Sequence, residues 1–335
     1  MLLDRGPKKG PSSGGGARRL PYVEPPSSVP PPAADACPAC SAGAPRALGE
    51  LPPCRGVLGQ RPGGWLLHCP SCGLFFRWPY VEDADARAAY AALPASLWQY
   101  TPGSRRDWQI AARFVEGRQQ CHAVLDIGCF TGGFLSLLPD RVARCGVEPC
   151  QAARDVAASR GVELIGCCFD DLRRSDRRFG VVTAFDVVEH VRDPLSLLRT
   201  AAGVTEPGGL IILSTGDADG LTFRLSRLDH YYYMSEHVSF VGLRWFRWAA
   251  DALGLRVRHT AHFAHSRQPV TRTATALVKC LTYSATRLTQ KWPRAYRYLA
   301  VAWPFSRAAR WERAPAVRGW PDHVLVVFEK PFRPA

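Results

Sequence analysis

Long apolar stretches are absent from this 335-residue sequence. No run approaches the roughly 18 apolar residues that a bilayer-spanning helix requires, so we expect no membrane-spanning segment. The first 30 residues contain no apolar core of the kind found in signal peptides, which predicts a cytoplasmic protein. In a reducing compartment, the 12 cysteines are expected to bind metal or to be buried as thiols rather than to form disulfides.

Acidic side chains are scarce in one C-terminal segment. Residues 266–320 contain eleven Lys and Arg residues but a single acid, Glu312. This segment carries most of the formal net charge of +14, and the rest of the chain is nearly neutral. A nearly neutral remainder offers no broad basic face, so the charge pattern does not favour nucleic acid as the main partner.

Four cysteines form two C-x-x-C pairs within residues 35–80, Cys37/Cys40 and Cys69/Cys72. Each pair can place two thiolates on one turn, and the two pairs together complete a closed tetrahedral site for structural Zn²⁺. We therefore expect an N-terminal zinc ribbon. The alternative is four buried thiols that hold no metal.

From residue 121 the sequence alternates between strand-like and helix-like segments. The strand-like segments are AVLDIG, ARCGVEP, VELIG, FGVVTAFD, GGLIILST, LRVRHTAHF and DHVLVVFEK. The helix-like segments are GGFLSLL, QAARDVAASRG, DPLSLLRTAAGV and LRWFRWAADALG. This alternation predicts an α/β fold with a Rossmann-like, doubly wound sheet of seven strands, whose ligands bind beyond the carboxyl ends of the strands.

The glycine loop after the first of these strands lacks one glycine of the dinucleotide-binding pattern. In VLDIGCFTGGFL (residues 124–135), Phe130 stands where G-x-G-x-x-G requires its second glycine. Gly128 still permits a sharp turn, and Gly132 permits a close approach of backbone to a ligand. Glu148 follows Gly128 by 20 residues, a spacing typical of an acid that binds ribose hydroxyls. The loop therefore favours a cofactor without a pyrophosphate, which does not need that pattern.

Five stretches, in order, resemble class I S-adenosylmethionine (SAM)-dependent methyltransferases: VLDIGCFTGGFL, GVEP, FGVVTAFDVVEHVRDPLSLL, EPGGLIILST and YYYMSEHVSF. Together they cover roughly residues 105–265 and 322–330. The resemblance implies that SAM is the methyl donor. It also implies which residues bind SAM: Asp126, Gly128, Cys129 and Gly132 along the loop, Glu148 at the ribose, Phe169, Asp170 and Asp171 beside the adenine, and Phe185 and Asp186 near the sulfonium.

Two histidines are candidates for activating the methyl acceptor, because histidine is the usual base near neutral pH. His190 follows Glu189, and the spacing Asp186-x-x-Glu189-His190 resembles ubiquinone-pathway O-methyltransferases, where such a cluster is associated with a divalent metal. That resemblance makes Mg²⁺ a candidate second cofactor. His237 lies in YYYMSEHVSF, beyond the fifth strand. We expect Glu189, His190 and His237 to be catalytic; the alternative is that they only pack or cap neighbouring helices.

The basic segment 266–320 is much longer than the short turn that the minimal fold needs. Leu277, Leu281 and Leu288 fall on one helical face, and aromatic residues alternate with arginines further on. Three interpretations stay open. The segment is a lid over the site or a dimer contact, or it is a peripheral contact with the inner face of the membrane, or it binds nucleic acid, which is less expected.

The combination of zinc ribbon and methyltransferase resembles deoxysugar C-methyltransferases and methyltransferases of glycan and natural-product pathways. It implies O- or C-methylation of a small-molecule, sugar or lipid-linked acceptor, with the ribbon forming one wall of the acceptor pocket. One alternative is a zinc-ribbon RNA methyltransferase, although no N-P-P-Y motif follows the fourth strand. Another is a catalytically inactive SAM-fold binding protein, with Phe130 as the lesion.

The predicted domain organisation has six parts: a disordered Pro/Gly/Ser-rich tail (1–34), the zinc ribbon (35–80), a helical linker (81–120), the SAM-binding core (121–265), the basic insert (266–320), and the last strand with the C-terminus (321–335).

Overall fold

The structure is a computed structural model that describes residues 36–80, 83–98, 103–289, 308 and 314–332. The predicted tail (1–34) and most aromatic positions of the basic insert lie outside the described residues, as does the side chain of Leu288. Among the described helices, none combines the length and the apolar character that crossing a bilayer requires.

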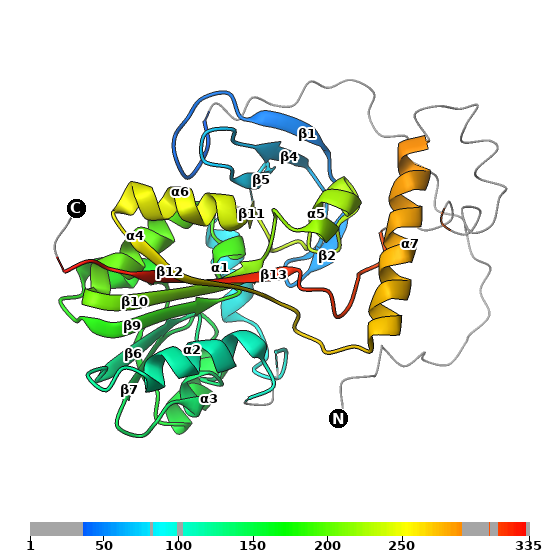
Figure 1. Cartoon of the computed structure of the whole chain (residues 1–335). Helices are drawn as coiled ribbons and strands as arrows, with labels where there is room; N and C mark the ends of the chain where they lie inside the picture. Colours follow the sequence, from blue (N-terminus) through cyan, green and yellow to red (C-terminus); the bar gives the residue numbers. More distant parts are fainter. Residues whose placement is uncertain (1–35, 81–82, 99–102, 290–307, 309–313, 333–335) are drawn as a thin grey trace. The chain divides into compact units, whose positions relative to one another are not determined.

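Seven strands form one mixed sheet in the order β12-β13-β10-β9-β6-β7-β8 (Figure 1). The strands from β10 to β8 in this order pair in parallel, and β13 runs antiparallel to both β10 and β12. This arrangement confirms the predicted Rossmann-like, doubly wound α/β fold. The strand bounds are β6 (Ala123–Ile127), β7 (Ala143–Val147), β8 (Glu163–Gly166), β9 (Phe179–Phe185), β10 (Thr205–Gly216), β12 (Arg256–Phe263) and β13 (His323–Glu329).

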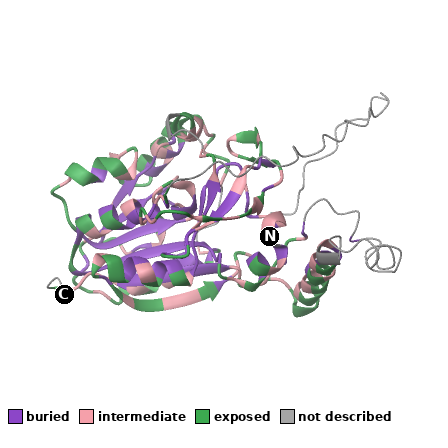
Figure 2. Ribbon diagram, turned by 90° about the horizontal axis from the view of Figure 1, so that it is seen from above, coloured by how far each residue is buried: buried purple, intermediate pink, exposed green. Residues whose placement is uncertain are grey.

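Helices cover both faces of this sheet. Helices α2 (Arg106–Glu116) and α3 (Gln151–Ser159) lie on one face, and α4 (Pro194–Val204) and α6 (Leu243–Leu253) lie on the other (Figure 1). Alternate strand residues point to opposite faces, so Val124 packs with the α2 side and Leu125 with the α4 and α6 side. The central strands β6, β9, β10 and β13 are buried almost throughout, whereas the edge strands β8 and β12 are largely half-buried or exposed (Figure 2). Each fully buried apolar side chain contributes about 1.5–3 kcal/mol.

The helix predicted for GGFLSLL is wrong. The structure has only a single 3₁₀ turn there, η1 (Leu135–Leu137). Gly132 has a φ of +74°, in the left-handed region, so a helix cannot run through it. Leu138 precedes Pro139, and a residue before proline is pushed out of the helical region. The space between these two positions is too short for an α-helix.

The segment with the four cysteines builds a second sheet in the order β1-β4-β5-β11. Its strands are β1 (Arg46–Glu50), β4 (Trp65–His68), β5 (Phe75–Trp78) and β11 (Ser239–Phe240), beside a separate hairpin of β2 (Cys54–Gly56) and β3 (Gly59–Arg61). Strand β11 comes from the YYYMSEHVSF stretch far along the chain and pairs with β5. The sheet therefore joins the cysteine segment to a loop of the methyltransferase-like core.

The remaining helices lie outside the two sheets. Helix α1 (Asp83–Ala91) precedes α2, and both lie within the segment predicted as a helical linker (81–120). The others are α5 (Leu221–Ser226), α7 (Val270–Thr289) and the 3₁₀ turns η2 (Phe169–Arg174), η3 (Val188–His190) and η4 (Arg227–Asp229).

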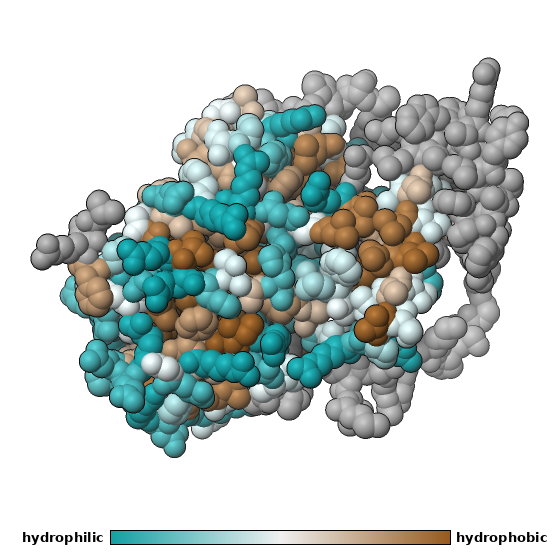
Figure 3. Space-filling view, viewed as in Figure 1, coloured by the Kyte–Doolittle hydropathy of each residue, from teal (hydrophilic) through white to brown (hydrophobic). Residues whose placement is uncertain are grey.

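Helix α7 packs on α5 through side chains that lie beside its leucines. Cys280 and Tyr283 are buried, and the Ser284 hydroxyl donates to the Leu225 carbonyl over 2.7 Å. Leu281 lies on the outward side with Val278, which is 60% exposed. Figure 3 shows apolar surface over α7 in that view. Leu277 is half-buried, so the predicted leucine face lies at the edge of the contact with α5 and is only partly exposed among the described side chains.

Candidate active site

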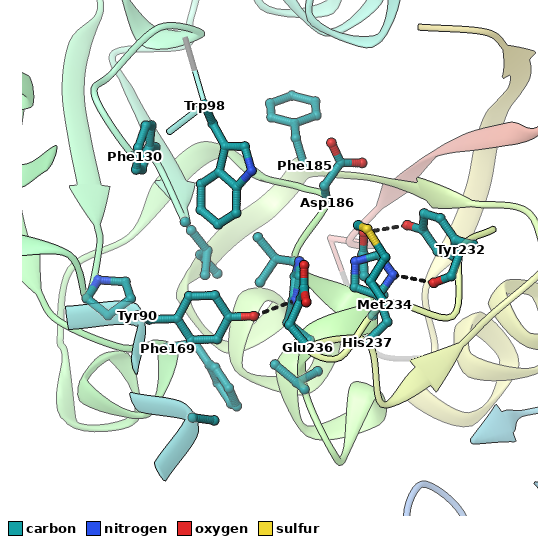
Figure 4. Close-up of a pocket in the computed structure, with 18 of the residues that line it drawn as sticks. Tyr90, Trp98, Phe130, Phe169, Phe185, Asp186, Tyr232, Met234, Glu236 and His237 are labelled. Atoms are coloured by element: carbon teal, nitrogen blue, oxygen red, sulfur yellow. Dashed lines mark hydrogen bonds between the residues drawn. The ribbon is translucent and has the colours of Figure 1, made fainter. Parts of the chain in front are cut away.

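A cavity of about 1130 Å³ lies at the carboxyl ends of the parallel strands. Gly128 follows β6, Glu148 follows β7 and Asp186 follows β9, and all three line it. The amino end of β13 reaches the same edge because β13 is antiparallel, which brings His323 to the wall. Figure 4 shows part of the lining. This is the place where ligands of doubly wound sheets bind.

The glycine loop adopts left-handed backbone at three positions: Gly128 (φ +77°), Phe130 (φ +45°) and Gly132 (φ +74°). A methyl group at Gly128 would lie 2.6 Å from Cγ2 of Val187, so glycine is required there. Phe130 takes the backbone conformation that a glycine would favour, and its ring packs edge-on against Trp98 at 5.3 Å (Figure 4). Phe130 therefore occupies the position of the second glycine of the G-x-G-x-x-G pattern, and its backbone is strained there.

Gly132, predicted to approach the cofactor, does not line the cavity. A side chain there would meet Val162 and Ala157 instead, so this glycine serves the packing of the loop onto α3 and β8. Cys129, in contrast, lines the cavity with its thiol buried. Burial raises the pKa of that thiol, so Cys129 stays neutral.

Glu148 and Asp126 are buried carboxyl groups at the base of the cavity. One oxygen of Glu148 accepts the Phe130 N–H over 2.9 Å, and the other accepts the Cys150 N–H over 2.8 Å. Burial raises the pKa of Glu148, although these two bonds oppose the shift. Asp126 accepts the Thr183 hydroxyl over 2.7 Å, and burial raises its pKa to about 7. Glu148 thus also holds the glycine loop, a role that its spacing did not reveal.

Phe169 and Asp170 line the cavity from η2, as the adenine assignment requires. Asp170 is exposed and pairs with Arg173 over 3.0 Å. Its neighbour Asp171 instead accepts the Cys167 and Cys168 N–H groups over 2.7 and 3.0 Å, so Asp171 shapes the turn.

Phe185 and Asp186 end β9 at the centre of the cavity. Asp186 has a φ of +53° and pairs with Arg105 over 2.7 Å, and Arg105 also pairs with Asp107. Burial would raise the pKa of Asp186, but Arg105, His265 and His323 together hold it below its usual range. Its second oxygen is buried and has no hydrogen-bond partner in the described part of the chain. The sequence had not singled out Arg105 or Asp107, because they lie before and within α2, far from any strand end.

Glu189, His190 and His237, the three candidate catalytic residues, lie close together in the structure. One ligand-type atom from each lies within 4.8 Å of the others. Tyr232 donates its hydroxyl to Glu189 over 2.5 Å, and Thr215 donates to the second oxygen of Glu189 over 2.9 Å. Burial raises the pKa of Glu189.

Each histidine of this cluster is held through its Nδ1 atom, and Figure 4 shows His237 beside Tyr232. His237 Nδ1 donates to the Tyr232 carbonyl over 2.7 Å, which leaves Nε2 without a proton. Burial lowers the pKa of His237 well below its usual value. His190 Nδ1 bonds to the Tyr90 hydroxyl over 2.7 Å. The cluster therefore offers two imidazole rings, each fixed by a hydrogen bond, beside a carboxyl group.

A second group of titratable side chains lies at the start of β13, where sequence reasoning named none. His323 Nδ1 lies 2.8 Å from Asp322 Oδ1, and the Tyr231 hydroxyl donates to Asp322 Oδ2 over 2.6 Å. His265 stacks edge-on against His323 at 4.2 Å. The Asp-His doublet that opens the strand DHVLVVFEK was the available signal, because such residues are unusual at the start of a buried strand.

The four predicted metal ligands also come together. Cys37 Sγ lies 3.7 Å from Cys72 Sγ, and Cys40 Sγ lies 3.5 Å from Cys69 Sγ. All four ligand atoms fall within 4.8 Å of one another. The same segment contributes part of the cavity wall through Ala36, Cys37, Pro38, Ser41, Trp78 and Tyr80.

Both ends of the basic insert border the cavity. Ser266 lines it at the first end, and Val317, Arg318 and Gly319 line it at the other. The Thr273 hydroxyl on α7 donates to the Arg318 carbonyl over 3.1 Å, which ties the two ends together. The described ends of the insert therefore lie beside the cavity, and the lid interpretation stays a prediction.

Comparison with known proteins agrees with this geometry. Residues 84–260, more than half of the chain, match the family described as a methyltransferase domain. A ubiquinone biosynthesis O-methyltransferase from Aeromonas salmonicida is 30% identical over 162 residues, which are 42% of this chain and 66% of that relative. Another from Ruegeria pomeroyi is 39% identical over 165 residues, which are 41% of this chain and 65% of that relative. The chain thus spans just under two thirds of the length of these curated relatives.

Among solved structures, a SAM-dependent methyltransferase from Thermotoga maritima, described as a possible histamine N-methyltransferase, is 15% identical with a TM-score of 0.41. The similarity covers 67% of this chain and 88% of that chain.

Proposed function

The chain belongs to the methyltransferase domain family, and we propose that it transfers the methyl group of SAM to a hydroxyl group of a small-molecule acceptor. One observation carries this proposal. A single continuous cavity contains both the glycine loop expected to bind SAM and the Glu189, His190 and His237 cluster expected to face the acceptor. At about 1130 Å³ the cavity exceeds the roughly 300–1000 Å³ of most single-ligand sites, so it has room for both molecules.

The charges of the cavity fit a cationic donor. When bound, SAM supplies a methyl group that is already activated on a positively charged sulfonium. Asp126, Glu148 and Asp186 are carboxyl groups that line the central part of the cavity. The buried second oxygen of Asp186 lacks a partner among the described residues, and a cation or a donor group would satisfy it. Because residue 128 is a glycine, the loop carries no side chain at the point where it passes closest to Val187.

We assign the donor residues as follows. Asp126, Gly128 and Cys129 bind the methionine part. Gly132 supports this part of the loop through packing. The groups assigned to the rest of SAM are Glu148 at the ribose, Phe169 and Asp170 at the adenine, and Phe185 and Asp186 at the sulfonium.

The acceptor side of the cavity is aromatic and polar. Trp78, Tyr80, Tyr90 and Tyr232 line it, and such rings suit a planar or sugar-like acceptor. The Tyr80 hydroxyl is buried without a partner among the described residues, so it can donate to an acceptor oxygen. Glu189, His190 and His237 would orient the acceptor hydroxyl, because proximity and orientation supply much of the rate of such a transfer.

The four cysteines suit structural Zn²⁺. Tetrahedral coordination at about 2.3 Å per bond separates the sulfurs by about 3.8 Å, close to the 3.5 and 3.7 Å between paired Sγ atoms. We therefore propose a zinc site that stiffens one wall of the cavity. Mg²⁺ at Glu189 is less favoured, because two of the three nearby ligand groups are imidazoles and Mg²⁺ prefers oxygen.

Binding of SAM tests the donor assignment. In Glu148→Gln, the new amide can no longer accept from both the loop and the ribose, so the affinity for SAM should fall by about 1.5–3 kcal/mol. Glu163→Gln is the matched control, because Glu163 is exposed on β8 and bonds to Arg177 away from the cavity. Equal SAM affinity in the two variants, measured by calorimetry, would overturn the assignment of Glu148.

Methyl-labelled SAM tests the acceptor class. The protein is incubated with the label and a cell lysate, and small molecules, lipids, RNA and protein are separated. We expect label in the small-molecule or lipid fraction. Label in RNA alone would replace the proposal with an RNA methyltransferase, and SAM binding without any transfer would favour an inactive binding protein.

A further inference from the structure

We propose that Asp322 and His323 form a catalytic dyad, in which His323 is the general base for the acceptor hydroxyl and Asp322 is its positioning residue. The inference rests on the proposed function, because a hydroxyl acceptor must lose a proton when it is methylated. The dyad lies at the start of β13 and is separate from the cluster of Glu189, His190 and His237.

The geometry of the pair fixes the proton on the ring. Asp322 Oδ1 lies 2.8 Å from His323 Nδ1, and a carboxylate can only accept, so Nδ1 carries the proton. Nε2 is then the basic nitrogen. The Tyr231 hydroxyl donates to Asp322 Oδ2 over 2.6 Å and holds the carboxylate in place. Asp322 is also fixed through its backbone, since its carbonyl accepts the Asp217 N–H over 2.8 Å.

The fold aims this pair at the reacting centre. In the sheet, His323 is paired with Gly216 of β10 and with Phe263 of β12, so it lies at the carboxyl edge although it begins its own strand. His323 lines the cavity and is only 7% exposed. A ring nitrogen of His323 lies within 4.8 Å of a carboxylate oxygen of Asp186, the residue assigned to the sulfonium. Nε2 takes no hydrogen bond from the described part of the chain.

The other histidines are less suited to receive the proton. His237 bonds to a backbone carbonyl, which fixes its tautomer but supplies no negative charge to stabilise an imidazolium. Burial lowers its pKa far below that of a useful base. Both oxygens of Glu189 already accept hydroxyl groups. Burial alone would also lower the pKa of His323, but the hydrogen bond and charge of Asp322 raise it above the ordinary value.

In the methyl transfer, each bond that forms is matched by a bond that breaks. The acceptor oxygen forms the new O–C bond, while the C–S bond of the donor breaks and its electron pair stays on sulfur. The hydroxyl proton passes to Nε2 of His323. The resulting imidazolium is stabilised by Asp322, as charged hydrogen bonds of this kind are strong.

Several other charged or titratable groups face His323 and set its pKa together with Asp322. They come from the loops after β9, α5 and β12: Asp186, Glu189, His230, Tyr231, Tyr232 and His265. The test therefore changes the immediate partners of His323 and leaves these groups in place.

The first readout needs no acceptor. Histidine-selective ¹⁵N labelling reports the tautomer and pKa of His323 by NMR, with His323→Asn to assign the signal. We expect Nδ1 to be protonated in the neutral ring and the pKa to lie above 6.5. Asp322→Asn should lower that pKa by about one unit or more, because it removes an adjacent charge. Tyr231→Phe should raise it, because Asp322 then keeps more of its charge for His323. A neutral ring protonated on Nε2 would overturn the dyad.

The second readout is kinetic and uses 4-methylcatechol as the hydroxyl acceptor with methyl-labelled SAM. His323→Asn should lower kcat by about 10²–10⁴-fold while SAM affinity is unchanged, whereas His122→Asn, an exposed histidine before β6, should leave both unchanged. The acidic limb of the pH–rate profile should move to lower pH in Asp322→Asn and to higher pH in Tyr231→Phe.

The two readouts separate the failures. An acidic limb that stays in place in both variants would show a structural role only and would overturn the dyad. If the wild-type protein binds SAM but leaves 4-methylcatechol unlabelled, the hydroxyl-acceptor proposal fails for this probe, and the NMR result still decides whether the dyad exists.

Discussion

Replacing Phe130 with glycine and with alanine separates backbone strain from ring contacts in the glycine loop. Phe130 has a φ of +45°, a left-handed conformation that costs an L-residue about 1–2 kcal/mol and glycine almost nothing. Its ring packs edge-on against Trp98 at 5.3 Å, a contact worth about 0.5–1.5 kcal/mol. Both variants lose the ring, but only Phe130→Gly relieves the strain.

The two variants should therefore differ in stability. Glycine gives up about 0.5–1 kcal/mol relative to alanine through the entropy of the unfolded chain, which offsets part of the relieved strain. We expect Phe130→Gly to be more stable than Phe130→Ala by about 1 kcal/mol. Urea unfolding measures this as a difference in midpoint at equal slope. An alanine variant as stable as the glycine variant would refute the strain at position 130.

SAM binding by the same variants tests whether Phe130 is a lesion. The residue contributes its backbone N–H to Glu148, and both substitutions keep that group. We expect the wild type to bind SAM and Phe130→Gly to bind it within about threefold, a difference of roughly 0.7 kcal/mol. Binding that appears only in Phe130→Gly would mean that Phe130 blocks the cofactor, and the proposed methyltransferase activity would then be wrong.

Three further outcomes follow from the geometry. Cys69→Ser should release bound zinc and lower the melting temperature, and unchanged zinc by elemental analysis would argue against the site. Gly128→Ala should lower SAM affinity at least about tenfold, since its methyl group would meet Val187 at 2.6 Å; calorimetry measures this. The ligand-free protein should lose stability as pH rises from 3.8 to about 7, because burial raises the folded-state pKa of Asp126. Asp126→Asn, which still accepts from Thr183, should flatten that slope in urea unfolding at pH 5–8.

The fold could be predicted because its strands carry local signals. Buried strands such as β9 read as uninterrupted apolar runs, and glycine or acidic residues mark where they end. The exception, GGFLSLL, has the apolar content of a helix but is confined between Gly132 and Pro139. Composition did not show this confinement, which depends on the backbone conformation of one residue. The pairing of β11 with β5 was equally invisible, because two residues of strand carry no periodic signal.

The residues that we assign to the donor could be placed at one edge of the sheet for a related reason. Gly128, Glu148 and Asp186 each stand directly after a parallel strand, and the ends of parallel strands meet at one edge. A residue that directly follows a parallel strand in the sequence is therefore expected at this edge of the sheet. Arg105 escaped prediction because it precedes a helix, and only the packing of α2 against the sheet brings it to Asp186.

His323 escaped prediction for a different reason, and that reason says how the two halves of the cavity differ. The donor half is formed by loops that follow the parallel strands β6, β7 and β9, whereas His323 opens the antiparallel strand β13. The first residue of an antiparallel strand lies beside the last residues of its parallel neighbours, so β13 delivers Asp322 and His323 to the same edge from the opposite direction. His237 arrives just before β11, which pairs with the cysteine-bearing sheet. Glu189 and His190 follow the parallel strand β9, but His237 and His323 come from segments outside the parallel core. We therefore expect substitutions at His237 and His323 to affect the acceptor while the binding of SAM is left intact.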